Sequence, residues 1–151
     1  MRREATERGW GWLIYAGLAL MLMSGCVAKM SVGGIPTGVE STINTVSADI
    51  TEERYDKVYN ESSELWKRDV TQAQSAEVLK TLHSKLGKVE SRTVHSATEQ
   101  QNSGGQLKGH AFIVTYQTKF ERGEAMETFT LVEENGHWLL ARYLVNSTAL
   151  Q

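Results

Sequence analysis

The sequence predicts an α+β fold in which two N-terminal helices pack on a four-stranded antiparallel meander. Apolar residues recur at helical spacing between residues 49 and 86, and beyond Gly87 the period changes to two. Two short turn signals, Arg122-Gly123 and Asn135-Gly136, then separate consecutive strands. With 40% hydrophobic and 23% charged residues in 151, the composition is that of one globular domain.

The first 25 residues have the pattern of an export signal. Three arginines within the first eight residues precede the charge-free run WLIYAGLALMLM, and the small residues Ser24 and Gly25 follow it. A basic segment, an apolar segment and a small-residue end are typical of a signal peptide. We therefore expect residues 1–25 to be removed from the mature protein.

The only cysteine stands where this signal ends. The segment LMSGC at 22–26 resembles the lipobox of bacterial lipoproteins. The resemblance implies cleavage between Gly25 and Cys26, a diacylglycerol on the Cys26 thiol, and a fatty acid such as palmitate on the new amino group. Val27, rather than Asp, after the cysteine implies an outer membrane location facing the periplasm.

A competing interpretation of the same region is an uncleaved membrane span. The charge-free stretch 9–28 has the length of about 20 residues that a helix needs to cross a bilayer. Its glycines and serine make it less apolar than a typical span. The two alternatives place the same domain beside a membrane by different means.

Residues 26–48 predict a tether. They mix Gly, Ser, Thr and the sole proline, Pro36, without a sustained period of two or 3.6. The folded domain is accordingly expected to occupy residues 49–151.

Two helices are expected at the start of this domain. Asp49 and Glu52 form a capping-box pattern, and an apolar stripe follows at Tyr55, Val58, Tyr59, Ser62, Leu65 and Trp66. Thr71 and Gln74 form a second capping-box pattern, whose stripe ends at Gly87. The sequence thus predicts one helix from Asp49 and a shorter one from Thr71.

Four strands should follow, at 88–99, 110–120, 124–133 and 138–147. Two-residue loops at Arg122-Gly123 and Asn135-Gly136 would pair Phe120 with Ala125 and Leu131 with Leu140. One sheet face then collects the apolar side chains that we assign to the helices: Phe112, Val114, Tyr116, Phe120, Phe129, Leu131, Trp138, Leu140 and Leu144.

Two charged residues share that face and suggest a site. In this register Glu127 and Arg142 lie diagonally on adjacent strands, with Tyr116 beside Glu127. A buried carboxylate and guanidinium must be paired or must line a wet cavity, because burying either alone is costly. The residues Tyr116, Glu127 and Arg142 therefore indicate either the polar floor of a ligand pocket or an internal ion pair.

The opposite sheet face is more apolar than a fully solvated face requires. It carries Ile113, Met126, Val132, Leu139 and Tyr143. The tether or the first helix could cover these residues, or they could form an interface with a protein partner or a second copy of the chain.

The sequence offers little for catalysis or for a cofactor. It has no metal-ligand, phosphate-loop, dinucleotide or esterase motif, so we expect no metal and no cofactor. A net charge of −2 argues against nucleic acid. Glu127 is the one candidate general base, and a neighbouring Arg142 would lower its basicity. We predict no catalytic residue and favour a non-enzymatic role.

The segments YDKVYNESSELWKRDVT, LGKVESR and FIVTYQTKFERGEAMETFTLVEENGHWLLARYLV resemble small bacterial lipoproteins that carry a domain of unknown function. Such domains are similar to the cystatin-like cone, also seen in nuclear transport factor two and ketosteroid isomerase. The resemblance implies helices packed in the concave face of a curved sheet. It brings no catalytic residue with it.

Three functions remain open at this point. The first is a lipid-anchored binding or accessory module in the cell envelope. The second is a small-molecule carrier or an isomerase-like enzyme that uses a concave pocket around Glu127 and Arg142. The third is a structural component of a larger envelope assembly.

Overall fold

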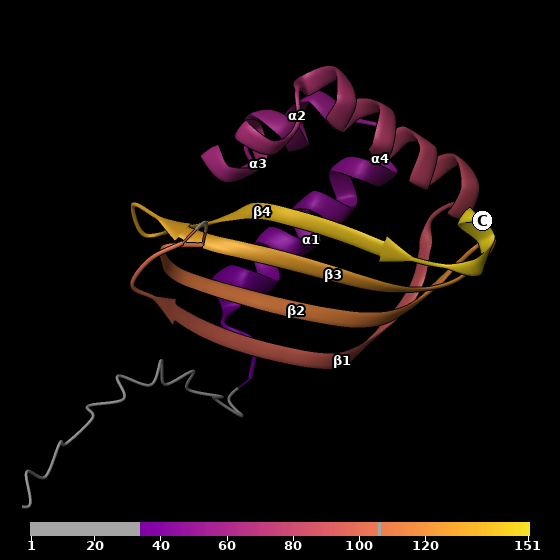
Figure 1. Ribbon diagram of the computed structural model, residues 1–151. Helices are drawn as coiled ribbons and strands as arrows, with labels where there is room; N and C mark the ends of the chain where they lie inside the picture. Colours follow the sequence, from indigo (N-terminus) through magenta and orange to yellow (C-terminus); the bar gives the residue numbers. More distant parts are fainter. Residues whose placement is uncertain (1–33, 106) are drawn as a thin grey trace, which may run out of the picture.

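A computed structural model describes residues 34–105 and 107–151, which form an α+β domain (Figure 1). The helices are α1 (Thr37–Thr51), α2 (Tyr55–Asn60), α3 (Glu64–Asp69) and α4 (Gln72–Leu86). The strands are β1 (Val89–Asn102), β2 (Gly109–Phe120), β3 (Gly123–Glu134) and β4 (His137–Asn146), followed by a 3-10 turn at Thr148–Leu150. The sheet is antiparallel in the order β1-β2-β3-β4, as predicted, but four helices replace the expected two.

Helix α1 corrects the predicted tether, because most of residues 34–48 belong to the folded domain. Val39, Ile43 and Val46 are buried in the main core together with side chains from the sheet. Their spacing of four and three residues is helical, but the surrounding Thr, Ser and β-branched residues are weak helix formers. Burial against the sheet, and not local propensity, stabilises this helix. The tether residues before Gly34 lie outside the described part of the chain.

Helix α1 ends where the sequence predicted that a helix begins. Glu53 takes a left-handed φ of 59°, Arg54 N–H donates to the Asp49 carbonyl at 2.8 Å, and Glu53 N–H donates to that of Ile50. These two bonds form a Schellman motif, which usually places glycine at the left-handed position. Asp49 is thus near the C-terminus of α1, and the predicted N-terminal capping box at this residue is wrong.

The expected long helix from Asp49 is three elements in the structure. After the end of α1, the apolar stripe continues through α2 and α3, which are separated at residues 61–63. Ser63 is completely buried; its N–H donates to the Leu140 carbonyl, and its Oγ accepts from Trp66 N–H. The break therefore docks the start of α3 onto the edge strand β4.

The helix predicted at Thr71 is confirmed. The reciprocal capping box between Thr71 and Gln74 is present, and α4 stops before Gly87, whose φ is 79°. A Cβ at position 87 would collide with the Glu121 side chain, so both φ and space favour glycine there.

The β2–β3 turn lies one residue earlier than predicted. Phe120 pairs with Gly123, which leaves Glu121 and Arg122 as the loop. Arg122 donates from its guanidinium to the last carbonyls of α4, and its N–H binds the Leu86 carbonyl. This docking fixes the loop, while the Asn135-Gly136 turn occurs as predicted.

A bulge in β4 changes the faces that follow it. Leu131 pairs with Leu140 as predicted, but Thr130 pairs with Arg142, so Ala141 is an extra residue. Beyond this point Tyr143 packs against the helix-facing core, while Leu144 is 64% exposed. The assignment of Leu144 to the core and of Tyr143 to the outer face is therefore wrong.

Candidate functional site

Glu127 lies on β3, fully buried, at the centre of a polar network on the helix-facing side of the sheet. Arg92 binds both carboxylate oxygens, with Nε 2.7 Å from Oε2 and Nη2 2.9 Å from Oε1. The hydroxyls of Thr118 and Tyr143 each donate to one of these oxygens at 2.5 Å. Four donors thus satisfy the buried charge, as a carboxylate out of water requires.

The residues around this network leave little open space beside Glu127. The third guanidinium nitrogen of Arg92, Nη1, lies 2.7 Å from the Ser47 hydroxyl of α1. The rings of Tyr116 and Phe129 lie 5.7 and 5.3 Å from the Arg92 guanidinium carbon, within cation–π range. A cavity of about 20 Å³ adjoins Glu127, roughly the space of one water. The network therefore leaves no room for a substrate beside Glu127.

Tyr143 is held in its neutral form by this environment. Burial raises the pKa of Tyr143 well above 10.0, and the charge of Glu127 and the hydrogen bond to it raise the pKa further, against the opposing charge of Arg92. A second ionised group beside Glu127 would be repelled. The hydroxyl is therefore a donor to the carboxylate and not a base.

Of the three predicted pocket residues, the structure brings two together. Glu127 and Tyr116 are direct neighbours across β3 and β2, but Arg142 points to the other side and lies 4.0 Å from Asp69 of α3. Arg142 points away from Glu127 because the bulge in β4 exchanges the sheet faces on which residues 142 and 143 lie. Arg92 of β1 takes the place that the sequence assigned to Arg142.

Sequence reasoning missed Arg92 because the first strand is polar and has no turn to fix its register. Two irregularities, at Val89/Ser91 and Val94/Ser96, further disturb its alternation. The usable signal was the buried Glu127 itself, which required a cation; Arg92 supplies it from β1, across the intervening strand β2.

The five predicted interface residues do not form one exposed patch. Tyr143 faces the core, and Val132 is buried in a small cluster with Leu65, Ala111 and Ala141, against which Leu107 packs. The remaining three, Ile113, Met126 and Leu139, are half-buried.

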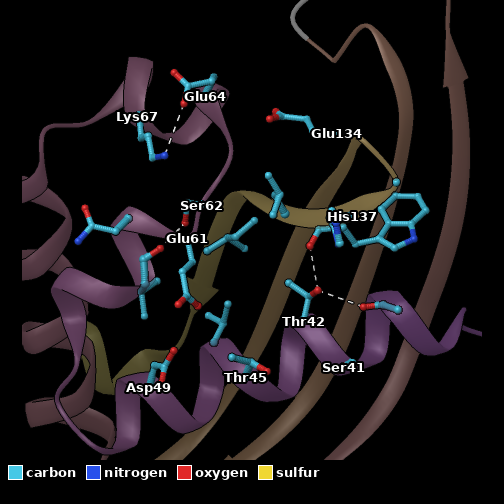
Figure 2. Close-up of a pocket in the computed structure, with 18 residues that line it drawn as sticks. Ser41, Thr42, Thr45, Asp49, Glu61, Ser62, Glu64, Lys67, Glu134 and His137 are labelled. Carbon is cyan, nitrogen blue, oxygen red and sulfur yellow. Dashed lines mark hydrogen bonds and ion pairs between the residues drawn. The ribbon is translucent and has the colours of Figure 1, made fainter.

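A groove of about 630 Å³ lies on the other side of α1, between this helix, the α2–α3 segment and the β3–β4 hairpin (Figure 2). Helix α1 contributes hydroxyls from the adjacent residues Ser41 and Thr42 and, one turn further along, from Thr45. The Thr42 hydroxyl lies 2.9 Å from the Trp138 carbonyl, which joins this wall to β4. Four carboxylates also line the groove: Asp49, Glu61, Glu64 and Glu134.

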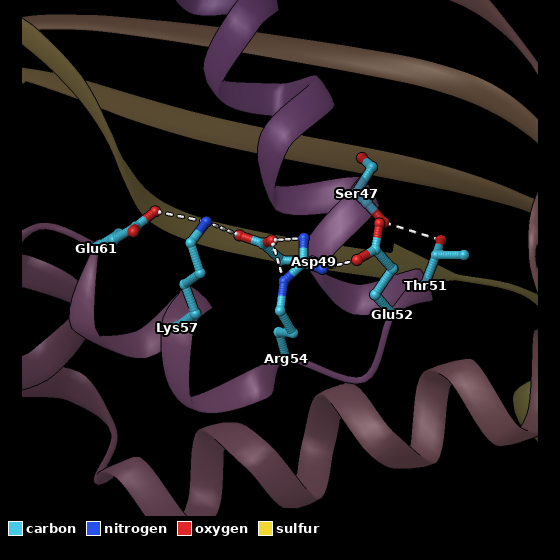
Figure 3. Close-up of polar contacts among 7 residues, drawn as sticks. All are labelled: Ser47, Asp49, Thr51, Glu52, Arg54, Lys57 and Glu61. Atoms are coloured by element: carbon cyan, nitrogen blue, oxygen red, sulfur yellow. Dashed lines mark hydrogen bonds and ion pairs between the residues drawn. The ribbon is translucent and has the colours of Figure 1, made fainter.

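Asp49 lines this groove and is 2% exposed. Figure 3 shows the cations that surround its carboxylate. Its carboxylate accepts from Arg54 Nε at 2.9 Å and from Lys57 Nζ at 2.8 Å, and Lys57 also reaches Glu61 at 3.2 Å. Burial alone would raise the pKa of Asp49, but the hydrogen bonds and charges of Lys57 and Arg54 outweigh it and lower the pKa below 3.8. Asp49 is therefore ionised at neutral pH.

A third cluster lies at the α1 N-terminal end of the sheet. His110 of β2 bridges Glu133 and Glu99 on the neighbouring strands, at 2.6 Å from each, and its ring lies edge-on to Trp138. The hydrogen bond to Glu133 raises the pKa of His110; burial opposes this, and Glu99 adds to the rise. Because the two ring nitrogens face different carboxylates, the three groups do not converge on one point.

Within residues 34–105 and 107–151, no three His, Cys, Asp or Glu side chains are placed to hold a metal ion. No helix in those residues is long and apolar enough to cross a membrane. The predicted cleavage site at Gly25 and the lipidation site at Cys26 lie outside the described residues, as does the whole of the alternative span 9–28.

The fold and site together define a small α+β domain in which each buried carboxylate of the described chain is held by the protein's own cations and hydroxyls. More particularly, the chain belongs to the family described as "Protein of unknown function (DUF4019)", whose profile matches residues 44–143. This confirms the resemblance to a domain of unknown function. No curated protein matches the sequence.

One solved structure similar to this chain is the crystal structure of a "Putative Scytalone Dehydratase" from Novosphingobium aromaticivorans. The two are 10% identical, with a TM-score of 0.43, over 74% of this chain and 82% of that one.

Proposed function

We propose that this protein is a lipid-anchored module of the cell envelope that binds a ligand or partner without catalysing a reaction. The anchor is the acylated Cys26, after removal of residues 1–25. The binding surface is the open groove beside α1, and the outer membrane, on its periplasmic face, is the proposed location.

The observation that carries the non-enzymatic role is the closure of the Glu127 network. A general base must reach the proton that it removes, directly or through one water. Glu127 instead receives hydrogen bonds from Arg92, Thr118 and Tyr143, and the adjoining space is about 20 Å³. The groove has about thirty times that volume, within the range of small-molecule sites.

The anchor is tested by intact mass spectrometry of the protein extracted from membranes with detergent. We expect a chain that starts at Cys26 and carries acyl groups, and Cys26→Ala should abolish both cleavage and acylation. Ser24→Ala serves as the matched control, since it keeps a small residue and the thiol. An uncut, unmodified wild-type chain would instead make residues 9–28 a membrane span.

The non-enzymatic role is tested by incubating the purified protein with an extract of envelope metabolites and comparing the products with those of Glu127→Gln. We expect no change in any metabolite. Turnover that is lost in Glu127→Gln would support the alternative of an isomerase-like enzyme and end this part of the proposal.

A further inference from the structure

We propose that the cluster of Glu99, His110 and Glu133 is a proton-operated latch, which holds Trp138 against the first turn of α1 when the His110 ring is protonated and releases it when the ring is neutral. Trp138 forms part of the wall of the groove beside α1, so the latch controls the shape of that groove. The inference adds regulation to the proposed binding site and rests on that binding role, but its test observes Trp138 itself and needs no ligand.

The latch crosses one end of the sheet on the side that faces the helices. His110 of β2 pairs with Gln101 of β1, and Glu133 of β3 pairs with Trp138 of β4. The bond between His110 Nδ1 and Glu133, at 2.6 Å, joins these two pairs into one row. Trp138 packs at the edge of the main core. A single imidazole therefore connects all four strands at this end.

The geometry of the cluster requires that His110 donate from both ring nitrogens. Nδ1 lies 2.6 Å from an oxygen of Glu133, and Nε2 lies 2.6 Å from an oxygen of Glu99. A neutral imidazole has one N–H donor and one lone pair, whereas the protonated ring has two N–H donors. With both carboxylates ionised, only the protonated ring satisfies both contacts. Loss of the proton sets a lone pair against one carboxylate, and that contact breaks.

Trp138 connects this cluster to α1. Its ring centroid lies 4.7 Å from that of His110, within the distance at which a cation is attracted to an indole ring. A Cβ at Gly38 would come within 2.9 Å of Trp138 Cδ1, so the indole packs directly on the backbone at the start of α1. The Trp138 carbonyl also accepts from the Thr42 hydroxyl at 2.9 Å. Because Gly38, Thr42 and Trp138 all line the groove, a change in the contact between His110 and the indole acts on its wall.

Within the described residues, Glu99 and Glu133 are the charged groups that contact His110. The other titratable side chains near it in the sequence, on the hairpin or on the first turn of α1 have no hydrogen bond or ion pair with it: Glu40, Lys108, Glu134 and His137. The bond to Glu133 raises the pKa of His110 above 6.5; burial opposes this, and Glu99 adds to the rise. The latch is therefore closed below pH 6.5 and opens as the pH rises through the folded-state pKa.

The mature protein contains two tryptophans, Trp66 and Trp138, so the wall residue can be observed directly. Fluorine NMR of the full-length mature protein in detergent, labelled with fluorotryptophan, follows both, and Trp138→Phe assigns the signals. From pH 6 to pH 9 we expect the Trp138 signal to shift, with a midpoint above 6.5. Its broadening by an uncharged gadolinium chelate should rise about twofold, because a half-buried ring opens to solvent. Trp66, which is buried and bonded to Ser75, should not change.

Three substitutions identify the group that titrates. His110→Gln keeps a hydrogen-bonding side chain that has no proton to lose in this pH range, and it should remove the step at Trp138. Glu133→Gln should lower the midpoint of the step, since it removes the charge that most favours the protonated ring. The matched control is His137→Gln, which changes an exposed histidine next to Trp138 and should leave the step unchanged.

A Trp138 step that survives His110→Gln, or that His137→Gln abolishes, would overturn the latch. So would a Trp138 signal that stays constant while the His110 imidazole titrates in the same sample, or an equal change at Trp66, which would mean a general loosening of the fold. None of these measurements uses a ligand or the acyl anchor. Failure of the latch therefore leaves the binding role standing, and the acyl-mass and turnover experiments decide the anchored, non-enzymatic role independently.

Discussion

This fold stabilises its two buried carboxylates, Glu127 and Asp49, in different ways. Glu127 is enclosed by the sheet and α1, and its cation, Arg92, is 16% exposed. Asp49 is almost as deeply buried, but its partners Arg54 and Lys57 are both 42% exposed, and Asp49 itself lines an open groove. The comparison shows that the exposure of the partners, and not of the carboxylate, distinguishes a sealed core charge from one at the surface.

The largest expected effect comes from removing the sealed partner. Arg92→Met leaves Glu127 buried without its cation and should lower the free energy of unfolding by about 3–5 kcal/mol. Arg142→Met, on the other side of β4, should cost less than about 1 kcal/mol because Arg142 is 41% exposed. Urea unfolding of both variants measures the difference. Similar losses of unfolding free energy in the two variants would contradict the assignment of Arg92, and not Arg142, as the cation that pairs with Glu127.

Tyr143→Phe removes one donor to Glu127 and should cost about 1.5–3 kcal/mol, the range for a hydrogen bond to a charged group. Tyr55→Phe is the matched control, since its hydroxyl meets His83 Nδ1 at 3.2 Å in a half-buried place, and it should cost about 1 kcal/mol or less. The raised pKa of Tyr143 adds a pH signature. The contribution of neutral Tyr143 to the free energy of unfolding is complete below pH 10.0 and is lost as the pH rises further. Tyr143→Phe should therefore reduce the loss of stability at alkaline pH.

Asp49→Asn should cost only about 1 kcal/mol at pH 7, because Arg54 and Lys57 can return to water. The lowered pKa of Asp49 means that its ionised form stabilises the fold above pH 3.8 and that this contribution is lost as the pH falls through the folded-state pKa. Unfolding measured from pH 5 to pH 2, in wild type and Asp49→Asn, checks this. If the free energy of unfolding falls between pH 5 and pH 2 as steeply in Asp49→Asn as in the wild type, the expected contribution of ionised Asp49 is contradicted.

The smallest effect concerns His110, whose two carboxylate partners are partly exposed. Its pKa is raised above 6.5, so protonated His110 stabilises the fold fully below pH 6.5, and this contribution disappears as the pH rises through the folded-state pKa. NMR titration of the His110 imidazole should give a midpoint above 6.5. Glu133→Gln should lower the His110 midpoint more than Glu99→Gln does.

The sequence predicted the elements that depend on local signals. The capping box at Thr71, the stop at Gly87 and the turn at Asn135-Gly136 each rest on neighbouring residues, and each occurs in the structure. The face of β2 was also predicted correctly, because Phe112 and Val114 alternate without interruption.

The predictions that were wrong concern features that depend on contacts between residues distant in the sequence. Helix α1 has modest propensity and is stabilised by the sheet, and it ends at a left-handed Glu53 where glycine would have marked the stop. The cation of the predicted site was missed because the bulge at Ala141 and the irregular β1 alter which residues face Glu127. The groove was not predicted, since its walls come from three separate segments.

The extra residue in β4 also has a consequence for how relatives are aligned. Without Ala141, a regular strand would still pair Leu140 with Leu131 and Tyr143 with Phe129, because removing the bulged residue restores the alternation from Leu140 onward. A homologue shorter by one residue here would therefore keep its tyrosine against the buried glutamate. Loss of one residue at position 141 should therefore leave the hydrogen-bond network around Glu127 unchanged. A sequence alignment of relatives should place gaps in this strand at that position.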